Sequence, residues 1–164
     1  MQHTNWSTKW LYSALSILLF SSFSCNSSMS TKITESDIHL INNQIKEAFD
    51  SRDTEKMLSY FSDDVVIETE IATPNGNQTI TFNKTSYKKV LDETFKIAQN
   101  YGYSVSNIDI NLKSDDTVAE VSSTVSEILT INGQVLNSTS YETTIFRLIE
   151  GKPLITSMSS KLAM

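Results

Sequence analysis

The sequence predicts an α+β fold in which three helices pack on one face of a curved, mostly antiparallel sheet. The main observation is a pair of long runs of alternating polar and apolar residues over 117–149, joined at Asn132-Gly133, the dipeptide most typical of a two-residue hairpin turn. Before these runs, apolar residues recur at steps of three and four, as on the buried face of a helix. Helices that precede a series of strands are typical of α+β domains.

The composition limits the class of protein. The chain has 164 residues, of which 39% are hydrophobic and 20% charged, as expected for one globular domain with a short appendage. The formal net charge is -6 and the basic residues do not cluster, so binding to nucleic acid through its phosphates is disfavoured. We therefore expect no nucleic-acid partner.

The first 25 residues have the pattern of an export signal. They contain no acidic residue and one lysine, Lys9, followed by an apolar run to Phe20 and small residues up to Cys25. The run is shorter than the roughly 20 apolar residues that a spanning helix needs, and serines interrupt it. A cleaved signal peptide over residues 1–24 is therefore favoured over a permanent anchor.

The end of this segment, Ser22-Phe23-Ser24-Cys25, resembles a bacterial lipobox, in which the cysteine is acylated and becomes the first residue of the mature protein. The resemblance implies a lipid anchor on Cys25 with the membrane as partner, and Asn26 implies the outer membrane, on its periplasmic side, in a Gram-negative cell. The alternative is ordinary signal-peptide cleavage, which gives a secreted protein. Residues 25–33 are expected to form a flexible tether before a domain over residues 34–164.

A first helix and a short second helix are expected at the start of this domain. Thr34-Glu35-Ser36-Asp37 has the form of a capping box and begins a helix that ends near Ser51. Asp53 is expected to cap a second helix over residues 54–61. Because Cys25 is the only cysteine, no disulfide within the chain can support these elements.

A third helix is expected after residue 82, capped by Asn83 or Thr85, with Gly102 ending it in the left-handed conformation. Its buried stripe is expected to contain Tyr87, Leu91, Phe95 and Ala98.

The remaining segments are predicted to be strands. They cover residues 65–71, 79–82, 103–112, 117–131, 134–149 and 153–162. A two-residue turn at Asn132-Gly133 pairs Ile131 with Gln134 and fixes the register of the long hairpin. This register places Glu127 and Glu142 on one face, together with apolar residues such as Val125, Leu129 and Phe146.

This order of elements resembles the cone-shaped NTF2-like fold, also called SnoaL-like. The resemblance is clearest over residues 45–53 and at Tyr60-Phe61-Ser62-Asp63-Asp64-Val65-Val66. It implies a bent sheet that wraps around a long helix and leaves a pocket at its wide end. Fold likeness of this kind does not by itself imply an activity.

The residues that the ketosteroid-isomerase branch of this fold uses for catalysis are not matched here. That branch uses a carboxylate base on an early strand, and a tyrosine with a protonated aspartate that polarises the substrate oxygen. In this chain Thr69 falls at the base position, and the first helix has no inward tyrosine. We therefore assign no catalytic residue, and we expect the pocket to lack a competent proton acceptor. His39, the only histidine after the signal, is expected to be exposed, and neither a metal site nor a cofactor is indicated.

Six residues are candidates for the pocket: Tyr60, Tyr87, Phe95, Glu127, Glu142 and Met158. The first hypothesis is a non-catalytic, lipid-anchored domain that binds a small apolar ligand in the pocket, or a protein partner such as a second copy through the sheet face. A purely structural interaction module of the cell envelope is a third option. The enzyme alternative uses Glu142 or Glu127 as acid or base on a small hydrophobic substrate. Against it, we expect these two carboxyls to lie at the wet, open part of the sheet, or to be turned outward by a bulge.

Overall fold

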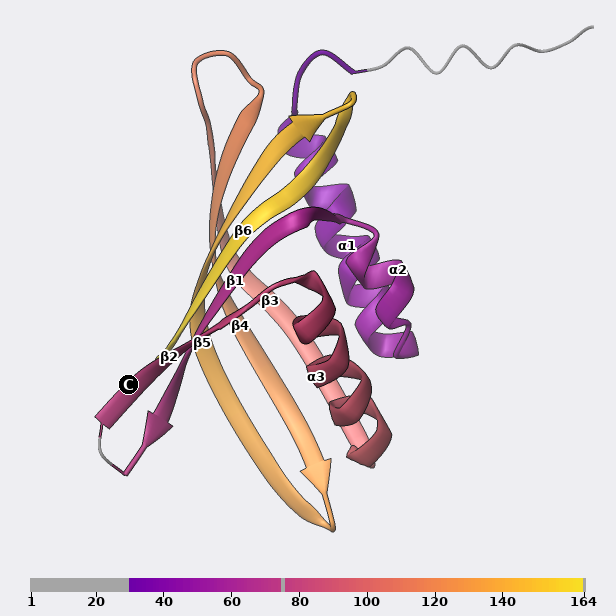
Figure 1. Ribbon diagram of the computed structural model, residues 1–164, viewed down its shortest axis with the longest axis vertical. Helices are drawn as coiled ribbons and strands as arrows, with labels where there is room; N and C mark the ends of the chain where they lie inside the picture. The colour runs from indigo at the N-terminus through magenta and orange to yellow at the C-terminus, as the bar shows by residue number, and fades with distance from the viewer. Residues whose placement is uncertain (1–29, 75, 164) are drawn as a thin grey trace, which may run out of the picture.

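The computed structural model describes residues 30–74 and 76–163, and within them it confirms the predicted α+β fold (Figure 1). The elements follow in the order α1 (Glu35–Ser51), α2 (Thr54–Leu58), β1 (Phe61–Thr73), β2 (Gly76–Phe82), α3 (Lys84–Ile97), β3 (Asn100–Leu112), β4 (Val118–Ile131), β5 (Gln134–Ile149) and β6 (Lys152–Leu162). The predicted signal peptide and Cys25 lie outside the described residues. In the described part of the chain, no helix is long and apolar enough to cross a membrane.

The start of α1 follows the prediction. The Thr34 side chain accepts a hydrogen bond from the backbone N–H of Asp37, and the Asp37 carboxylate accepts one from the backbone of Thr34. One difference lies just before the cap, where a flexible tether is expected. Ile33 is buried in the core, and the Lys32 ammonium forms an ion pair with Asp116 at 2.9 Å. The folded domain therefore includes the end of the predicted tether.

The second helix is shorter than predicted. It ends at Leu58, and Phe61, which the sequence places at its end, is the first residue of β1. The backbone carbonyl of Tyr60 accepts a hydrogen bond from the N–H of Ile155 at 2.8 Å, so the chain has already joined the sheet there. A tertiary contact therefore overrides the local helical pattern.

The end of α3 also differs from the prediction. The helix begins as expected at the Asn83 cap, but it ends at Ile97 with an extended Ala98, and Gly102 is not its left-handed cap. Gly102 lies inside β3, paired with Ile128 of β4. Strand β3 therefore begins at Asn100, three residues before the predicted start.

The six strands form one sheet in the order β2-β1-β6-β5-β4-β3. Neighbouring strands are antiparallel except β1 and β6, which are parallel. The long hairpin has the predicted register, with Ile131 opposite Gln134, and its ladder continues without a bulge to Val118 opposite Arg147.

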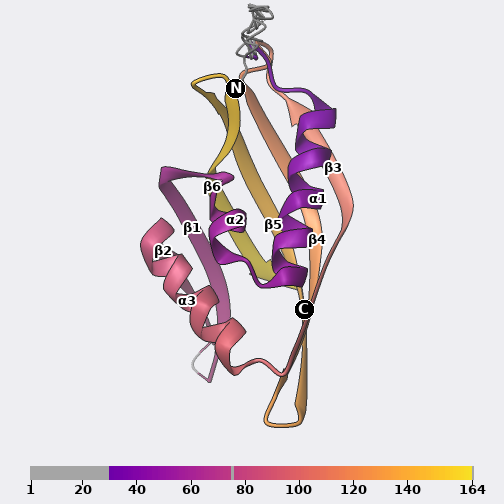
Figure 2. The same ribbon diagram turned by 90° about the vertical axis from the view of Figure 1, so that its right-hand side faces the viewer.

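The three described helices lie on the concave side of the sheet (Figures 1 and 2). Figure 2 shows α1 over the half of the sheet that contains β3 and β4, α3 over the half that contains β1 and β2, and α2 between them. The core between the two layers contains Ile38, Met57, Ile67 and Phe146, all almost fully buried. The helices α1 and α3 therefore cover different halves of the sheet.

Arg52 ties the ends of two helices together. It follows α1 in the left-handed conformation, with φ 57°. Its guanidinium donates hydrogen bonds to the backbone carbonyls of Phe95 and Ala98, both at 3.0 Å, and of Gln99, at 3.2 Å. These carbonyls lie at the C-terminal end of α3, where intrahelical donors run out. Arg52 therefore holds the end of α3 against the end of α1.

We expect Arg52→Ala to lower the free energy of unfolding by about 2 kcal/mol, because three charge-assisted hydrogen bonds are lost and the carbonyls are only partly rehydrated. Urea denaturation followed by circular dichroism measures this change. Arg147→Ala is the matched control, because Arg147 is exposed and is expected to change the free energy by less than about 0.5 kcal/mol. If both substitutions change the free energy of unfolding equally, the hydrogen bonds of Arg52 to the end of α3 make no specific contribution to stability.

Candidate functional site: an acidic cavity inside the cone

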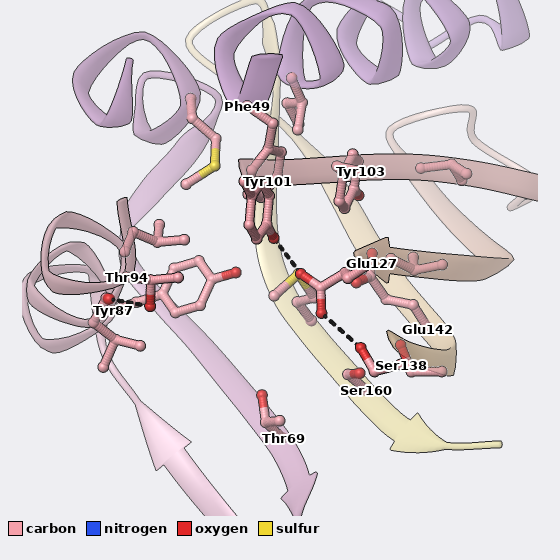
Figure 3. Close-up of a pocket in the computed structure, with 18 of the residues that line it drawn as sticks. Phe49, Thr69, Tyr87, Thr94, Tyr101, Tyr103, Glu127, Ser138, Glu142 and Ser160 are labelled. Atoms are coloured by element: carbon pink, nitrogen blue, oxygen red, sulfur yellow. Dashed lines mark hydrogen bonds between the residues drawn. The ribbon is translucent and has the colours of Figure 1, made fainter. Parts of the chain in front are cut away.

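A cavity of about 520 Å³ lies between the helices and the concave face of the sheet. All nine described helices and strands contribute residues to its wall, which is mainly apolar and aromatic. The polar groups of the wall are concentrated on α3, β3, β4 and β5, where tyrosine hydroxyls and two carboxyls are found (Figure 3). This combination of an apolar wall and a few convergent polar groups is typical of small-molecule sites.

The structure places four of the six predicted pocket residues on this cavity, namely Tyr87, Glu127, Glu142 and Met158. Tyr60 is not among them, because it lies beyond the shortened α2 and lines a separate groove of about 250 Å³ beside Leu40. Phe95 is not among them either, because it is buried behind the wall, where its ring packs edge-on against Tyr101 with centroids 5.4 Å apart.

The aromatic wall beneath α1 is built on Phe49. Its ring stacks on Tyr103 with centroids 4.1 Å apart and on Tyr101 with centroids 5.6 Å apart. Both tyrosines lie on β3, two residues apart, so they share one face of the strand. Gly102 has an aromatic residue on each side in the sequence. If Gly102 lies within a strand, this pattern predicts an aromatic face on that strand. The prediction that Gly102 ends the helix leaves Tyr101 outside the strand, and Tyr103, although predicted to begin the strand, is not among the predicted pocket residues.

Glu127 lies inside the cavity, opposite Ser138 in the long hairpin. The Tyr101 hydroxyl donates a hydrogen bond to its Oε1, and the Ser138 hydroxyl donates one to its Oε2 at 3.4 Å (Figure 3). Hydrogen bonds of this kind stabilise a carboxylate in a partly buried position. Among the residues that line the cavity, none is a lysine, arginine or histidine that neutralises this charge.

Glu142 lies on β5 and also points into the cavity (Figure 3). Its Oε1 accepts a hydrogen bond from the Thr144 hydroxyl at 3.1 Å. Burial is the main cause that raises the pKa of Glu142 to about 7; the Thr144 hydrogen bond acts against this rise, and the charge of Glu127 adds to it. At neutral pH this carboxyl therefore exchanges readily between its protonated and ionised forms.

These two glutamates correct an expectation drawn from the sequence. Both residues line the cavity and are half-buried, and no bulge turns them outward, because the β4–β5 ladder runs without interruption past both residues. The expectation that the cavity lacks a proton acceptor is wrong for the same reason. The sequence of a strand does not show which of its residues will line a cavity formed with distant elements.

Two further phenols face the cavity without a protein partner. Within residues 30–74 and 76–163, the hydroxyls of Tyr87 and Tyr103 make no side-chain hydrogen bond, and Figure 3 shows the Tyr87 hydroxyl directed into the cavity. Burial raises the pKa of both phenols well above the usual value, and the charges of Glu142 and Glu127 raise it further. Both groups therefore remain protonated and free to donate a hydrogen bond to a ligand.

Thr69 and Glu68 face opposite sides of β1, as the sequence predicts. Thr69 lines the cavity, whereas the neighbouring Glu68 is exposed on the other face of β1. His39 is exposed on α1. In the described part of the chain, no three histidine, cysteine or acidic side chains come close enough together to hold a metal ion.

Fold and site together define a cone-shaped α+β domain with an internal, acidic cavity. No protein-family model matches the chain, and no curated protein sequence matches it. Solved structures match the chain, and they show that it has the NTF2-like fold.

Three solved structures illustrate the likeness. A conserved protein from Planctomyces limnophilus DSM 3776 is 18% identical with a TM-score of 0.67, over 79% of this chain and 95% of that one. An NTF2-like protein from Cytophaga hutchinsonii ATCC 33406 is 15% identical with a TM-score of 0.62, over 80% and 100% of the two chains. A hexachlorocyclohexane dehydrochlorinase from Novosphingobium barchaimii LL02 is 10% identical with a TM-score of 0.62, over 79% and 86%. At these identities the likeness establishes the fold and leaves the activity open.

The raised pKa of Glu142 makes the stability of the protein depend on pH. The ordinary pKa of this group is 4.5 and the folded-state pKa is about 7, so the folded state binds the proton more tightly than the unfolded state. The free energy of unfolding should therefore fall as the pH rises from about 5 to 7 and then level off.

We expect Glu142→Gln to remove this dependence and to increase the free energy of unfolding at pH 8 by about 1 to 3 kcal/mol relative to the wild type. Urea unfolding at pH 5 and pH 8 measures the effect. Glu68→Gln, which removes an exposed acid from the same sheet, should leave the pH dependence unchanged. A pH profile that is identical in Glu142→Gln and the wild type would contradict the burial of an ionisable group at this position.

Proposed function

We propose that this protein binds a small, mostly apolar molecule in the cavity of the cone, with polar groups of the ligand directed towards β3, β4 and β5. The observation that supports the proposal is the wall itself, where an apolar and aromatic lining surrounds two carboxyls and two unpartnered phenols. The hydroxyls of Tyr87 and Tyr103 make no hydrogen bond to the described residues, so they are available to donate hydrogen bonds to a ligand or to water in the cavity. The volume of about 520 Å³ lies within the range of roughly 300 to 1,000 Å³ found for small-molecule sites.

A second candidate function is acid–base catalysis on the bound molecule. It is favoured by one observation, the pKa of about 7 for Glu142, since a general acid or base works best when its pKa is near the working pH. Glu142 would accept a proton from the ligand, while Tyr87 or Tyr103 donates a hydrogen bond to the ligand oxygen on which negative charge develops. One relative of the same fold is a dehydrochlorinase, but its identity of 10% carries no residue roles to this chain.

Proton exchange separates catalysis from binding. If Glu142 is the base, the protein accelerates exchange of acidic C–H protons in small aryl ketones in D2O, as followed by proton NMR. Glu142→Gln should then slow this exchange at least about a hundredfold without loss of thermal stability. Exchange that Glu142→Gln leaves unaltered would exclude Glu142 as the base.

The predicted export and lipid anchor form part of the same proposal. We propose that the domain acts in the cell envelope, attached through acylated Cys25, on the basis of the lipobox-like Ser22-Phe23-Ser24-Cys25. Mass spectrometry of the membrane fraction tests this step, since an unmodified N-terminus would refute it.

A protein partner is the further option, and its support is the outer face of the sheet, which exposes Val66, Ile128 and Tyr141. A monomeric state in solution would argue against pairing of two copies through that face.

Ser160 provides a direct test of the binding site. It lies on β6, opposite Glu142 of β5, and it lines the cavity. We expect Ser160→Phe to fill part of the cavity and to weaken binding of the neutral apolar dye N-phenylnaphthylamine at least about tenfold, as measured by its fluorescence.

Ser159→Phe is the matched control, because Ser159 is the next residue on the strand and its side chain lies on the opposite face. This variant should bind the dye as the wild type does. Equal dye binding by both variants would place the ligand outside the cavity.

A further inference from the structure

We propose that the cavity selects organic cations, and that its ligand is a small aromatic or aliphatic amine carrying a positive charge at neutral pH. This inference rests on the proposed binding function and adds the charge class of the ligand. It is drawn from the distribution of charge, rings and unpartnered oxygens over the wall of the cavity.

The charges on the wall all have the same sign. Glu127 and Glu142 are the only residues with a formal charge among those that line the cavity, and no lysine, arginine or histidine is present there. The seven ion pairs in the described part of the chain all lie elsewhere on the molecule. A carboxylate pair without a cation attracts a positively charged ligand and repels an anionic one, and the attraction is stronger inside a low-dielectric wall than in water.

The aromatic side chains of the wall can contact the apolar part of such a ligand and can also attract its positive charge. The aromatic side chains of the lining are Phe49, Phe61, Phe82, Tyr87, Tyr101 and Tyr103. Aromatic rings around a cation contribute favourable electrostatic energy in addition to apolar contact. A neutral apolar ligand uses the same rings but gains nothing from the two carboxyls.

Acceptors for the N–H groups of an amine are also present. Oε1 of Glu142 accepts from Thr144, whereas Oε2 of Glu142 receives no hydrogen bond from the described residues. The hydroxyl oxygens of Tyr87 and Tyr103 face the same space and can accept as well as donate. An ammonium group has three donors, so it can satisfy the free carboxyl oxygen and further oxygens at once.

Binding of a cation is linked to the proton on Glu142. The titratable groups that face Glu142 are Glu127 on β4, Tyr101 and Tyr103 on β3, and Tyr87 on α3, whereas the lining residues of α1, α2, β1, β2 and β6 carry no titratable side chain. In the free protein Glu142 is partly protonated at pH 7. An ammonium group beside it favours the carboxylate, so that the carboxyl O–H bond breaks and the proton passes to solvent as the ion pair forms.

The experiment compares three naphthalene probes of similar size, 2-naphthylmethylamine, 2-naphthylmethanol and 2-naphthoate, by isothermal titration calorimetry on the intact protein. The expected result is binding of the amine at pH 8 at least about tenfold tighter than that of the alcohol, with the carboxylate weakest. The affinity for the amine should rise about tenfold between pH 6 and pH 8, and titrations at pH 7 in buffers of different ionisation enthalpy should show proton release.

Substitutions of the two glutamates test which of them causes the preference for the amine. Glu142→Gln should abolish the pH dependence and weaken binding of the amine about tenfold or more, and it should weaken binding of the alcohol by a smaller factor. Glu127→Gln should also weaken binding of the amine, and it keeps the test informative if Glu142→Gln does not fold. Glu68→Gln, on the exposed face of the sheet, is the control and should bind all three probes as the wild type does.

The outcomes separate the two proposals. Equal or tighter binding of the alcohol or the carboxylate in the wild type overturns selection of cations and leaves the binding function in place. Absence of binding by all three probes at millimolar concentration overturns the binding function itself, and with it this inference.

Discussion

The register of the long hairpin is the constraint on which the site depends. Side chains alternate between the two faces of a strand, so a slip of one residue would move Glu127 and Glu142 from the cavity to solvent. The turn prevents such a slip, because Asn132 and Gly133 both adopt positive φ, 51° and 78°, as a tight two-residue connection requires. The N–H of Gly133 also donates to the side-chain oxygen of Gln99 at 2.9 Å, which ties the tip of the hairpin to the segment that follows α3.

The cavity combines interactions that oppose one another. An apolar wall favours neutral side chains, yet two carboxyls lie within it, and burial together with the charge of Glu127 destabilises the ionised form of Glu142 in the folded protein. The hydrogen bonds from Tyr101 and Ser138 to Glu127, and from Thr144 to Glu142, offset part of this cost. A group that destabilises a fold and is nevertheless held in a cavity is a reasonable candidate for a functional role, because function and stability often make opposite demands.

Local signals in the sequence were sufficient for much of the fold but not for the character of the site. The capping box at Thr34 and the hairpin register are short-range features, and each was predicted from a few neighbouring residues. Gly102 misled the prediction because glycine suits both a helix end and a strand, so Tyr101 was left outside the predicted strand. Tyr103 was placed on that strand, but a single aromatic residue at its start did not indicate a cavity wall. The face of Glu142 was predicted correctly, but its burial was not, because burial depends on how far α1 and α3 extend over a sheet that is distant in sequence.

The parallel pairing of β1 with β6 has a consequence for the order of folding. β6 lies between β1 and β5, so it joins the ribbon of β1 and β2 to the ribbon of β3, β4 and β5. During synthesis both ribbons emerge from the ribosome before residues 152–162, and each has an edge that only β6 can cover. Closure of the sheet therefore waits for the last of its strands, and until then these edges are the places where a nascent chain is most exposed to self-association.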